Sequence, residues 1–331
     1  MVNGGGLVAI TGADGFVGRA LCTHWRETGV PFRGLVRTLS HSTAAQPDML
    51  PVGDLTTISD AALTNALRGA QAVVHLAGRA HVMRETAVDP LARFRAINVV
   101  ATERIARAAA QAGTKHFVFA SSVKVNGEST RQGQAMRESD PPDPRDDYAA
   151  SKWEAECALA DVARETGMAV TILRLPLLYG PGVKGNVARL TMAIARGVPL
   201  PLASIDNRRS VLGAGNFASA LDALLGAPPP ASRSATIFFL ADTAPVSSPG
   251  LVRAIAAALG VKPHLVPVPR EVLYFVGACV GKAGTVDRLT DSLVVDAAAF
   301  RVAFGWQPPR SLAEELADMV RARGEAGPPP L

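Results

Sequence analysis

LVAITGADGFVG, residues 7–18, is the stretch that decides the fold of this 331-residue chain. Leu7–Thr11 is a short apolar run that predicts a buried strand, and Arg19–Thr28 has the apolar spacing of a helix, which Gly29 ends. The glycines between them allow a sharp turn, a close approach of the backbone to a ligand and tight packing of helix on strand. The first amides of the helix are then free to bind a phosphate. The segment predicts a phosphate-binding loop, with an ordinary strand–helix turn as the alternative.

The alternation of strand and helix repeats along the first half of the chain. Apolar runs predict strands, and stretches with helical spacing, two of them closed by glycine, predict helices. The further strands are expected at Phe32–Arg37, Val73–Ala77, Phe117–Ser121 and Val170–Leu175, and the further helices at Ala61–Leu67, Arg93–Ala112 and Tyr148–Glu165. Strands without polar alternation are typical of a parallel sheet that is covered on both faces. The predicted fold class is therefore α/β, with a doubly wound parallel sheet.

Beyond about Tyr179 the alternation loosens into segments rich in proline and glycine. We expect residues 1–178 to form a nucleotide-binding domain and residues 179–331 to form mainly a smaller substrate lobe. One or more segments, such as 211–240, are expected to return to the first domain, with a late strand at Thr236–Leu240. Helices are predicted in this half at Val187–Arg196, Asn216–Leu225, Pro249–Leu259 and Leu312–Arg323, followed by a frayed tail at Gly324–Leu331.

Composition excludes several classes of protein. The net charge of +5 is spread over dispersed Arg and Lys without a block of like charges, so nucleic-acid binding is not favoured, and an anionic small ligand or a mildly basic surface explains the charge. Cys22, Cys157 and Cys279 have neither disulfide nor zinc spacing, and this usage fits a reducing cytoplasm.

Neither a signal peptide nor a transmembrane segment is expected. The first residues lack a basic region followed by a long apolar stretch. Val272–Val280 is apolar, but a bilayer span needs about 20 apolar residues. We therefore expect this segment to form a buried or interfacial helix.

Tyr148 and Lys152 are the pair of residues that predicts chemistry. They are four apart on a predicted helix, so both side chains emerge on one face about one turn apart. An ammonium beside a phenol favours the phenolate and lowers the phenol pKa. Tyr148 is then suited to accept a proton from an alcohol or to donate one to a ketone oxygen, whereas a solvated Tyr and Lys on a helix surface is the alternative.

The spacing G-x-x-G-x-x-G, preceded by Thr11, resembles the short-chain dehydrogenase/reductase superfamily. The rest of that family's pattern follows in order over nearly the whole chain. It comprises Gly53-Asp54-Leu55, His75-Leu76-Ala77-Gly78, Asn98, Ser121-Ser122, Tyr148 with Lys152, and Arg174 through Tyr179-Gly180-Pro181. The length resembles the extended branch, which acts on nucleotide sugars, and implies a Rossmann-type fold and an NAD(P) cofactor.

The resemblance assigns roles to individual residues. Ser122, rather than Ser121, matches the catalytic Ser/Thr and would hold the reacting oxygen beside Tyr148, while Ser121 is expected to satisfy local backbone groups. Asp54 resembles the residue that hydrogen-bonds adenine, with Leu55 packing on the ring. The implied cofactor contacts are Gly12, Gly15, Phe16, Val17, Gly18, Arg37, Asp54, Leu55, Ala77, Gly78, Tyr148, Lys152 and Leu175.

Arg37 bears on the choice of cofactor. It stands at the end of the second predicted strand, about 20 residues beyond the glycine loop, where an acid would bind the NAD ribose. An arginine there is able to pair with the 2′-phosphate of NADP. The sequence favours NADP(H), with NAD(H) and a merely exposed arginine as the alternatives. His75 and His81 are expected to be packed or hydrogen-bonded rather than to act as bases.

Substrate contacts are implied by resemblance in the second half. Ser122, Asn186, Arg209 and Arg288 resemble residues that bind the sugar nucleotide, the arginines through its diphosphate. One departure is Leu177, which occupies a place where the family often has Asn. Sugar dehydratases carry a carboxylic acid and a base just after the catalytic Ser/Thr, and this chain has Val123-Lys124 there, so dehydration is not expected.

The segment Ser121–Glu128 looks most like that of bacterial reductases of UDP-4-keto-6-deoxy-N-acetylhexosamine, which make sugars for surface polysaccharide. The runner-up is a UDP-hexose or UDP-N-acetylhexosamine 4-epimerase, which uses the same Ser, Tyr and Lys and retains NAD. A weaker alternative is a non-catalytic protein that senses NADP. A homodimer is compatible with the sequence, which leaves the oligomeric state open.

Overall fold

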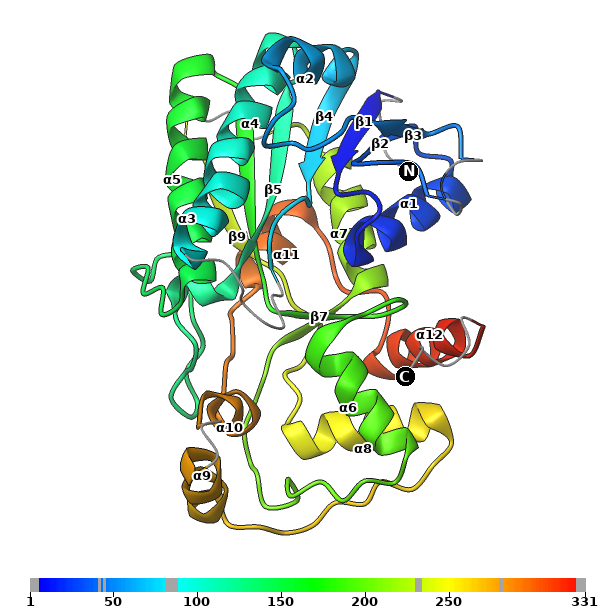
Figure 1. The fold of residues 1–331 in the computed structure, drawn as a ribbon, viewed down its shortest axis with the longest axis vertical. Helices are drawn as coiled ribbons and strands as arrows, with labels where there is room; N and C mark the ends of the chain where they lie inside the picture. Colours follow the sequence, from blue (N-terminus) through cyan, green and yellow to red (C-terminus); the bar gives the residue numbers. More distant parts are fainter. Residues whose placement is uncertain are drawn as a thin grey trace.

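The computed structural model describes residues 6–40, 43, 46–80, 89–229, 234–279 and 283–325. Its main feature is a seven-stranded sheet in the order β3-β2-β1-β4-β5-β6-β9, in which every neighbouring pair is parallel (Figure 1). The strands are β1 (Leu7–Thr11), β2 (Phe32–Val36), β3 (Met49–Pro51), β4 (Ala70–His75), β5 (His116–Ser122), β6 (Ala169–Leu175) and β9 (Thr236–Phe239). The predicted α/β class with a doubly wound parallel sheet is confirmed.

Helices cover both faces of this sheet (Figure 1). One face is packed by α2 (Asp60–Leu67), α4 (Ala101–Gln111) and α5 (Asp147–Thr166), and the other by α1 (Phe16–Thr28), α7 (Ala214–Gly226) and α11 (Ala298–Phe304). The strand order reverses at β1, which lies between β2 and β4. In open α/β sheets, ligands bind at the carboxyl ends of the strands near such a reversal.

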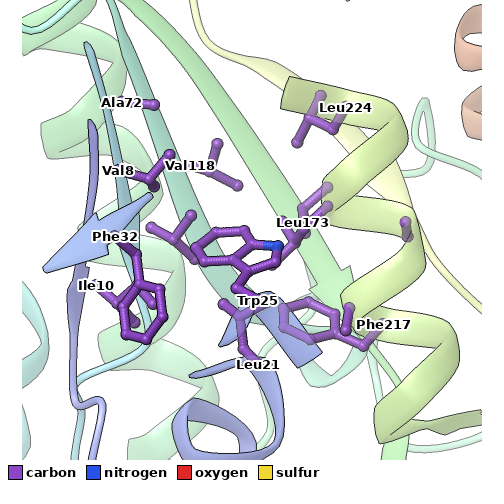
Figure 2. Close-up of a cluster of buried hydrophobic side chains, with 14 of the residues drawn as sticks. Val8, Ile10, Leu21, Trp25, Phe32, Ala72, Val118, Leu173, Phe217 and Leu224 are labelled. Atoms are coloured by element: carbon purple, nitrogen blue, oxygen red, sulfur yellow. The ribbon is translucent and has the colours of Figure 1, made fainter. Parts of the chain in front are cut away.

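Trp25, a residue of α1, lies at the centre of the core that α1 and α7 form with the sheet. Figure 2 shows its indole between the sheet residues Val118 and Leu173 and the α7 residue Phe217. The ring is fully buried, and its Nε1 donates to Asp222 Oδ1 at 2.7 Å. His24 lies within 2.6 Å of the other Asp222 oxygen. One carboxylate of α7 thus joins α7 to two neighbouring residues of α1.

The second half of the chain contributes to both parts of the molecule. β9 pairs with β6, and α7 packs against α1, so the stretch between residues 211 and 240 does reach the large sheet. The border at residue 178 stays a proposal. The smaller lobe contains β7 (Leu177–Tyr179), β8 (Val211–Gly213), α6 (Gly185–Ala195), α8 (Ser248–Leu259), α9 (Arg270–Cys279), α10 (Ala283–Thr290) and α12 (Leu312–Glu325).

The prediction of one regular helix over Arg93–Ala112 is wrong. It divides into α3 (Pro90–Arg95), a π-helical turn η1 (Ala96–Val100) and α4. A π turn inserts an extra residue into the helix, and such turns are frequent at functional sites. Here the turn carries Asn98, which is fully buried and bonded to Arg79 and Ser151.

Other sequence predictions differ from the structure in burial or extent. The apolar segment that begins at Val272 forms α9, in which Val272 is 48% and Phe275 is 71% exposed. Of the two expected alternatives, a fully buried helix is therefore excluded, and an interfacial helix stays a prediction. Arg37 lies one residue beyond β2. α12 continues to Glu325, past the predicted start of fraying, and residues 280, 326–331 and His81 lie outside the described residues. Within the described ranges, no helix combines the length and the apolar character needed to cross a bilayer.

Replacing Asp222 tests how strongly α7 is tied to α1. Asp222→Ala removes the acceptor of the buried Trp25 N–H, which should lower the free energy of unfolding by about 1–3 kcal/mol. Asp222→Asn keeps an acceptor oxygen and should lose less. Urea unfolding of both variants and the wild type measures the difference, and a loss under about 0.5 kcal/mol for Asp222→Ala would contradict this account.

Candidate active site

The candidate site lies at the carboxyl ends of β1, β4, β5 and β6. Parallel pairing brings these ends to one edge of the sheet, with Thr11 opposite His75 and Ser122 opposite Leu175. Both Ser122 and Leu175 are buried. The glycine loop leaves β1 at this edge, so the predicted cofactor loop and the predicted catalytic serine share it.

Two glycines of the loop, Gly12 and Gly18, leave no room for a side chain. Gly12 has a φ of 67°, and a Cβ on it would lie 2.8 Å from the Ala77 nitrogen. A Cβ on Gly18 would lie 2.2 Å from the Gly12 carbonyl oxygen. Glycine is therefore required at both positions, first for the backbone conformation and second for the contact of α1 with the loop.

The N-terminus of α1 fits an anionic ligand. Gly15 is the N-cap of α1, and no side-chain hydrogen bond from a described residue caps the helix there. The first turn, which includes Phe16 and Val17, contains no acidic residue. The helix dipole and the first amides favour a negative charge there. Arg19 follows one turn later and donates to the Asp14 carbonyl at 2.6 Å. These residues could hold the pyrophosphate of a dinucleotide.

The loop after β4 lies close to Lys152 of α5. The Ala77 N–H donates to Thr11 Oγ1 at 3.2 Å, and the next residue is Gly78. A Cβ on Gly78 would lie 3.2 Å from Asn98 Oδ1 and 3.5 Å from Lys152 Nζ. Small residues here leave a surface beside Lys152 that a flat or narrow group could approach.

Asn98 connects this loop to α5. Its Oδ1 accepts from the Arg79 N–H at 2.8 Å, and its Nδ2 donates to the Arg79 carbonyl at 3.0 Å and to Ser151 Oγ at 2.9 Å. Ser151 is the neighbour of Lys152 in the chain. Asn98 belongs to the family pattern, but the sequence predicted no role for it. The π turn that directs its side chain inward has no local sequence signal.

Tyr148 lies beside Ser122. Burial raises the pKa of Tyr148 to about 12, against a lowering by its hydrogen bond with the Ser122 side chain, and the charge of Asp146 raises it further. The Phe94 ring packs edge-on against the tyrosine ring, with centroids 6.2 Å apart. The phenol is thus protonated at neutral pH and in contact with the serine.

Lys152 lies beneath the site rather than at its surface. Nζ donates to the Ala120 carbonyl at 2.9 Å and sits 4.4 Å from the centre of the Phe119 ring. Burial lowers the pKa of Lys152 to about 8, and the negative charge of Glu156 opposes that shift. Near pH 7 the ammonium is mostly retained, but it loses its proton more readily than a solvated lysine.

A buried ion pair lies one turn farther along α5. Arg174 Nη2 and Glu156 Oε2 are 2.6 Å apart, and both side chains are 1% exposed. Ser121 Oγ donates to Glu156 Oε1 at 2.5 Å, and Arg174 Nη1 donates to Asn126 Oδ1 at 2.7 Å. The expected role of Ser121 toward local backbone is therefore corrected, because its hydroxyl binds the Glu156 carboxylate.

Sequence reasoning missed Glu156 and Asn126. A signal for Glu156 existed, since it is four residues beyond Lys152 and hence on the same face of α5. Asn126 lies in the 3₁₀ turn η2 (Val123–Asn126), and its partner Arg174 is distant in the chain. Only the parallel pairing of β5 with β6 brings the two together.

His75 is a hydrogen-bonded core residue, as the sequence predicted. Its ring lies between Thr11 Oγ1 at 2.6 Å and Thr102 Oγ1 at 2.9 Å. Burial lowers the pKa of His75 to about 3, and the charge of Lys152 adds to the effect. The ring is neutral at physiological pH. Among the described residues, no group of His, Cys, Asp and Glu could hold a metal ion.

Arg37 and Asp54 lie at the open side of the sheet, beyond β2 and β3. Arg37 is exposed, and its carbonyl accepts from the Gly53 N–H at 3.1 Å. The backbone N–H of Thr56 lowers the pKa of Asp54, with smaller contributions from the Thr56 hydroxyl and the charge of Arg37. Leu55 is partly buried against the core on that side. A cation and a carboxylate thus stand on this side of the sheet, and their contact with the adenosine end of a cofactor stays a prediction.

The residues proposed to contact substrate are more widely separated. Asn186 is exposed at the start of α6 and accepts from Arg189. Arg209 precedes β8, and its Nη1 donates to the Asp291 carbonyl at 2.9 Å. Arg288 lies in α10, with a side chain outside the described part of the chain. Ser122, Tyr148 and Lys152 meet at one place. Asn186, Arg209 and Arg288 lie apart from that group, in the smaller lobe.

A family model, that of the NAD dependent epimerase/dehydratase family, matches residues 8–234. The chain belongs to this family. As a member it is an enzyme that works with a nicotinamide dinucleotide, and the resemblance to extended short-chain dehydrogenases/reductases is confirmed at this level. The matched range includes the glycine loop and the whole Ser122, Tyr148 and Lys152 group.

Individual relatives are similar to this chain over different shares of its length. A UDP-glucose 4-epimerase of Vibrio cholerae is 35% identical over 318 residues, which cover 95% of this chain and 94% of that protein. An N-acetyl-alpha-D-glucosaminyl-diphospho-ditrans,octacis-undecaprenol 4-epimerase of Escherichia coli O157:H7 is 30% identical over 212 residues, 63% of this chain and 60% of that one. The solved structure of MoeE5 in complex with UDP-glucuronic acid and NAD has a TM-score of 0.75 and 25% identity, and covers 97% of this chain and 100% of that one.

Breaking the buried ion pair of this family member tests its role in holding the site together. Arg174→Met leaves the Glu156 carboxylate buried without its cation, which should lower the free energy of unfolding by about 3–5 kcal/mol. Arg174→Met/Glu156→Leu removes both charges and should be more stable than the single variant. Urea unfolding compares them, and a single variant as stable as the double one would refute this account.

Proposed function

We propose that the protein transfers hydride at C4 of a UDP-linked sugar, and in particular that it reduces a UDP-4-keto-6-deoxy-N-acetylhexosamine with NADPH. The observation that carries the chemical part is the contact of Tyr148 with Ser122 beside Lys152, at the sheet edge that also bears the glycine loop. A UDP-sugar substrate is supported by the names of the relatives and by the bound ligand of MoeE5. The 4-keto-6-deoxy form is inferred from the Ser121–Glu128 segment.

The three residues divide the acid–base work. Ser122 would donate its hydroxyl hydrogen to the carbonyl oxygen at C4 and hold it next to the phenol. Tyr148, protonated because burial raises its pKa to about 12, would give its proton to that oxygen as the carbonyl becomes an alcohol. The bound cofactor supplies the hydride that C4 gains. Lys152 would stabilise the resulting phenolate until solvent returns a proton.

Arg37 supports NADPH over NADH. It follows β2 at the point where NAD-binding chains of this type carry an acid, and no acid is present there. Its guanidinium is exposed and suited to a phosphate. A reductase must exchange its oxidised cofactor after each turnover, so a preference for NADPH is consistent with reduction.

A 4-epimerase is the second candidate function. The Vibrio cholerae relative, which covers nearly the whole chain, carries that name. The same Ser122, Tyr148 and Lys152 would serve, because an epimerase oxidises C4 and then returns the hydride to the other face. A non-catalytic role is disfavoured, since the partly buried Tyr148 contacts the buried Ser122 and lies one helical turn from the buried Lys152. Asn186, Arg209 and Arg288 are proposed to bind the UDP diphosphate in either case.

Two reaction mixtures separate the reductase from the epimerase. With a UDP-4-keto-6-deoxy-N-acetylhexosamine and NADPH, we expect one NADPH oxidised per sugar, measured by nicotinamide absorbance. With UDP-N-acetylglucosamine and no added cofactor, we expect no 4-epimer. Tyr148→Phe should reduce turnover at least about a hundredfold without preventing cofactor binding. Epimer formed on copurified NAD, without NADPH oxidation, would make the second candidate correct.

Arg37→Asp tests the cofactor preference. Loss of a phosphate partner and gain of an acid should shift the preference from NADPH toward NADH by about tenfold or more, equivalent to roughly 1.4 kcal/mol. Arg253→Asp makes the same change of charge at an exposed position on α8 and serves as the control. Cofactor affinities measured by fluorescence titration give the ratio. A wild-type protein that already prefers NADH would overturn the argument from Arg37.

A further inference from the structure

Lys124 contacts both of the elements that carry the reacting groups. It lies in η2, and its backbone N–H donates to Ser122 Oγ at 3.2 Å. Its ammonium donates to Asp146 Oδ2 and to Glu128 Oε1, each at 2.5 Å. The side chain is only 24% exposed. One residue therefore connects the serine to the start of the helix that bears Tyr148.

Asp146 uses its two carboxylate oxygens for different purposes. Oδ1 accepts from the Ala149 N–H at 2.7 Å and caps α5, whereas Oδ2 accepts from Lys124. The residue stands two positions before Tyr148. Its negative charge raises the pKa of the Tyr148 phenol, because a nearby carboxylate disfavours the phenolate. The cation that pairs with this carboxylate is the ammonium of Lys124.

We propose that Lys124 is a positioning residue of the active site, which holds Ser122 and Tyr148 in register and balances the carboxylate charge beside the phenol. The proposal rests on the proposed roles of Ser122 and Tyr148. In the sequence, Lys124 stands where sugar dehydratases carry a carboxylic acid or a base, and its positioning role follows from its contacts in the fold. The lysine acts through Asp146 and the η2 turn and needs no contact with substrate.

The arrangement of charges makes this proposal specific. Among the described residues, the charged groups considered around Tyr148 are Asp147 and Lys152 on α5, the N-cap Asp146, Lys124 on η2, the nearby Glu128, and Arg79 on the other side of the Phe94 ring. Lys124, Asp146 and Glu128 together carry a net charge of −1. Removing the ammonium makes the net charge of this cluster −2, and neutralising Asp146 as well returns it to −1.

The environment of Lys124 is consistent with a retained positive charge. Burial lowers its pKa, but the hydrogen bonds to Asp146 and Glu128 outweigh that effect, and the resulting pKa is above the usual value for lysine. The ammonium is therefore present throughout the physiological range. A half-buried lysine with two carboxylate partners also loses much of its conformational freedom, so the distance between η2 and α5 is well defined.

The test measures the titration of Tyr148 and turnover separately. The phenolate absorbance is followed with saturating NADP⁺ or NAD⁺, whose positive ring favours the phenolate, and the Tyr148→Phe spectrum is subtracted. Lys124→Met should move the Tyr148 transition upward by roughly half a pH unit or more. Lys124→Met/Asp146→Asn should return it toward the wild-type value, and Asp146→Asn alone, which retains a good helix cap, should move it downward.

Turnover and control variants complete the design. Lys124→Met should lower kcat about tenfold or more through misplacement of Ser122 and Tyr148, and Lys124→Arg should restore most of it. Glu154 lies on α5, as Tyr148 does, and forms an ion pair at the surface with Arg95 of α3. Glu154→Gln removes this pair and should leave titration and kcat unchanged. The titration needs no substrate, so it separates this proposal from the proposed function. An unmoved Tyr148 transition in Lys124→Met, or an Asp146→Asn shift in the upward direction, would overturn it.

Discussion

The buried pair of Arg174 and Glu156 is the constraint on which the site depends. Both charges are removed from water, so each must keep its partner and its additional hydrogen bonds from Ser121 and Asn126. Those bonds join two neighbouring strands, the turn after β5 and the middle of α5. The group that bears the reactive hydroxyls is thereby fixed by polar contacts as well as by the apolar core, and a shift of α5 along the sheet would leave a buried charge unpaired.

Burial then sets the protonation states of Tyr148 and Lys152, the two residues proposed to react. It disfavours the charged form of each, which raises the pKa of Tyr148 to about 12 and lowers that of Lys152 to about 8. A protonated phenol is suited to donate a proton in reduction. The same residue would accept a proton only as the phenolate, which the ammonium of Lys152 and the positive charge of an oxidised nicotinamide would favour. In the proposed reaction, the direction of proton transfer would therefore depend partly on which form of the cofactor is bound.

Reductase and epimerase chemistry place the same demands on Ser122, Tyr148 and Lys152, and the difference between them lies elsewhere. An epimerase must let its intermediate turn within the site and keep its cofactor, whereas a reductase must release its cofactor in every cycle. If Arg37 binds the adenosine end of the cofactor as proposed, cofactor release would depend on that end and substrate rotation on the smaller lobe. Such a separation would allow one fold to carry different reactions.

The sequence by itself determined the elements and groups that depend on local spacing. The glycine loop, the alternating strands and helices, and Tyr148 with Lys152 are set by residues close together in the chain, where periodicity and backbone freedom report directly on structure. Tertiary structure alone decided the polar partners, such as Glu156 for Arg174 and Asp146 for Lys124. It also decided the inward turn at Asn98 and the exposure of Phe275. Periodicity identifies the face of an element that is buried, but a hydrogen bond between distant residues depends on how strands and helices pack in three dimensions.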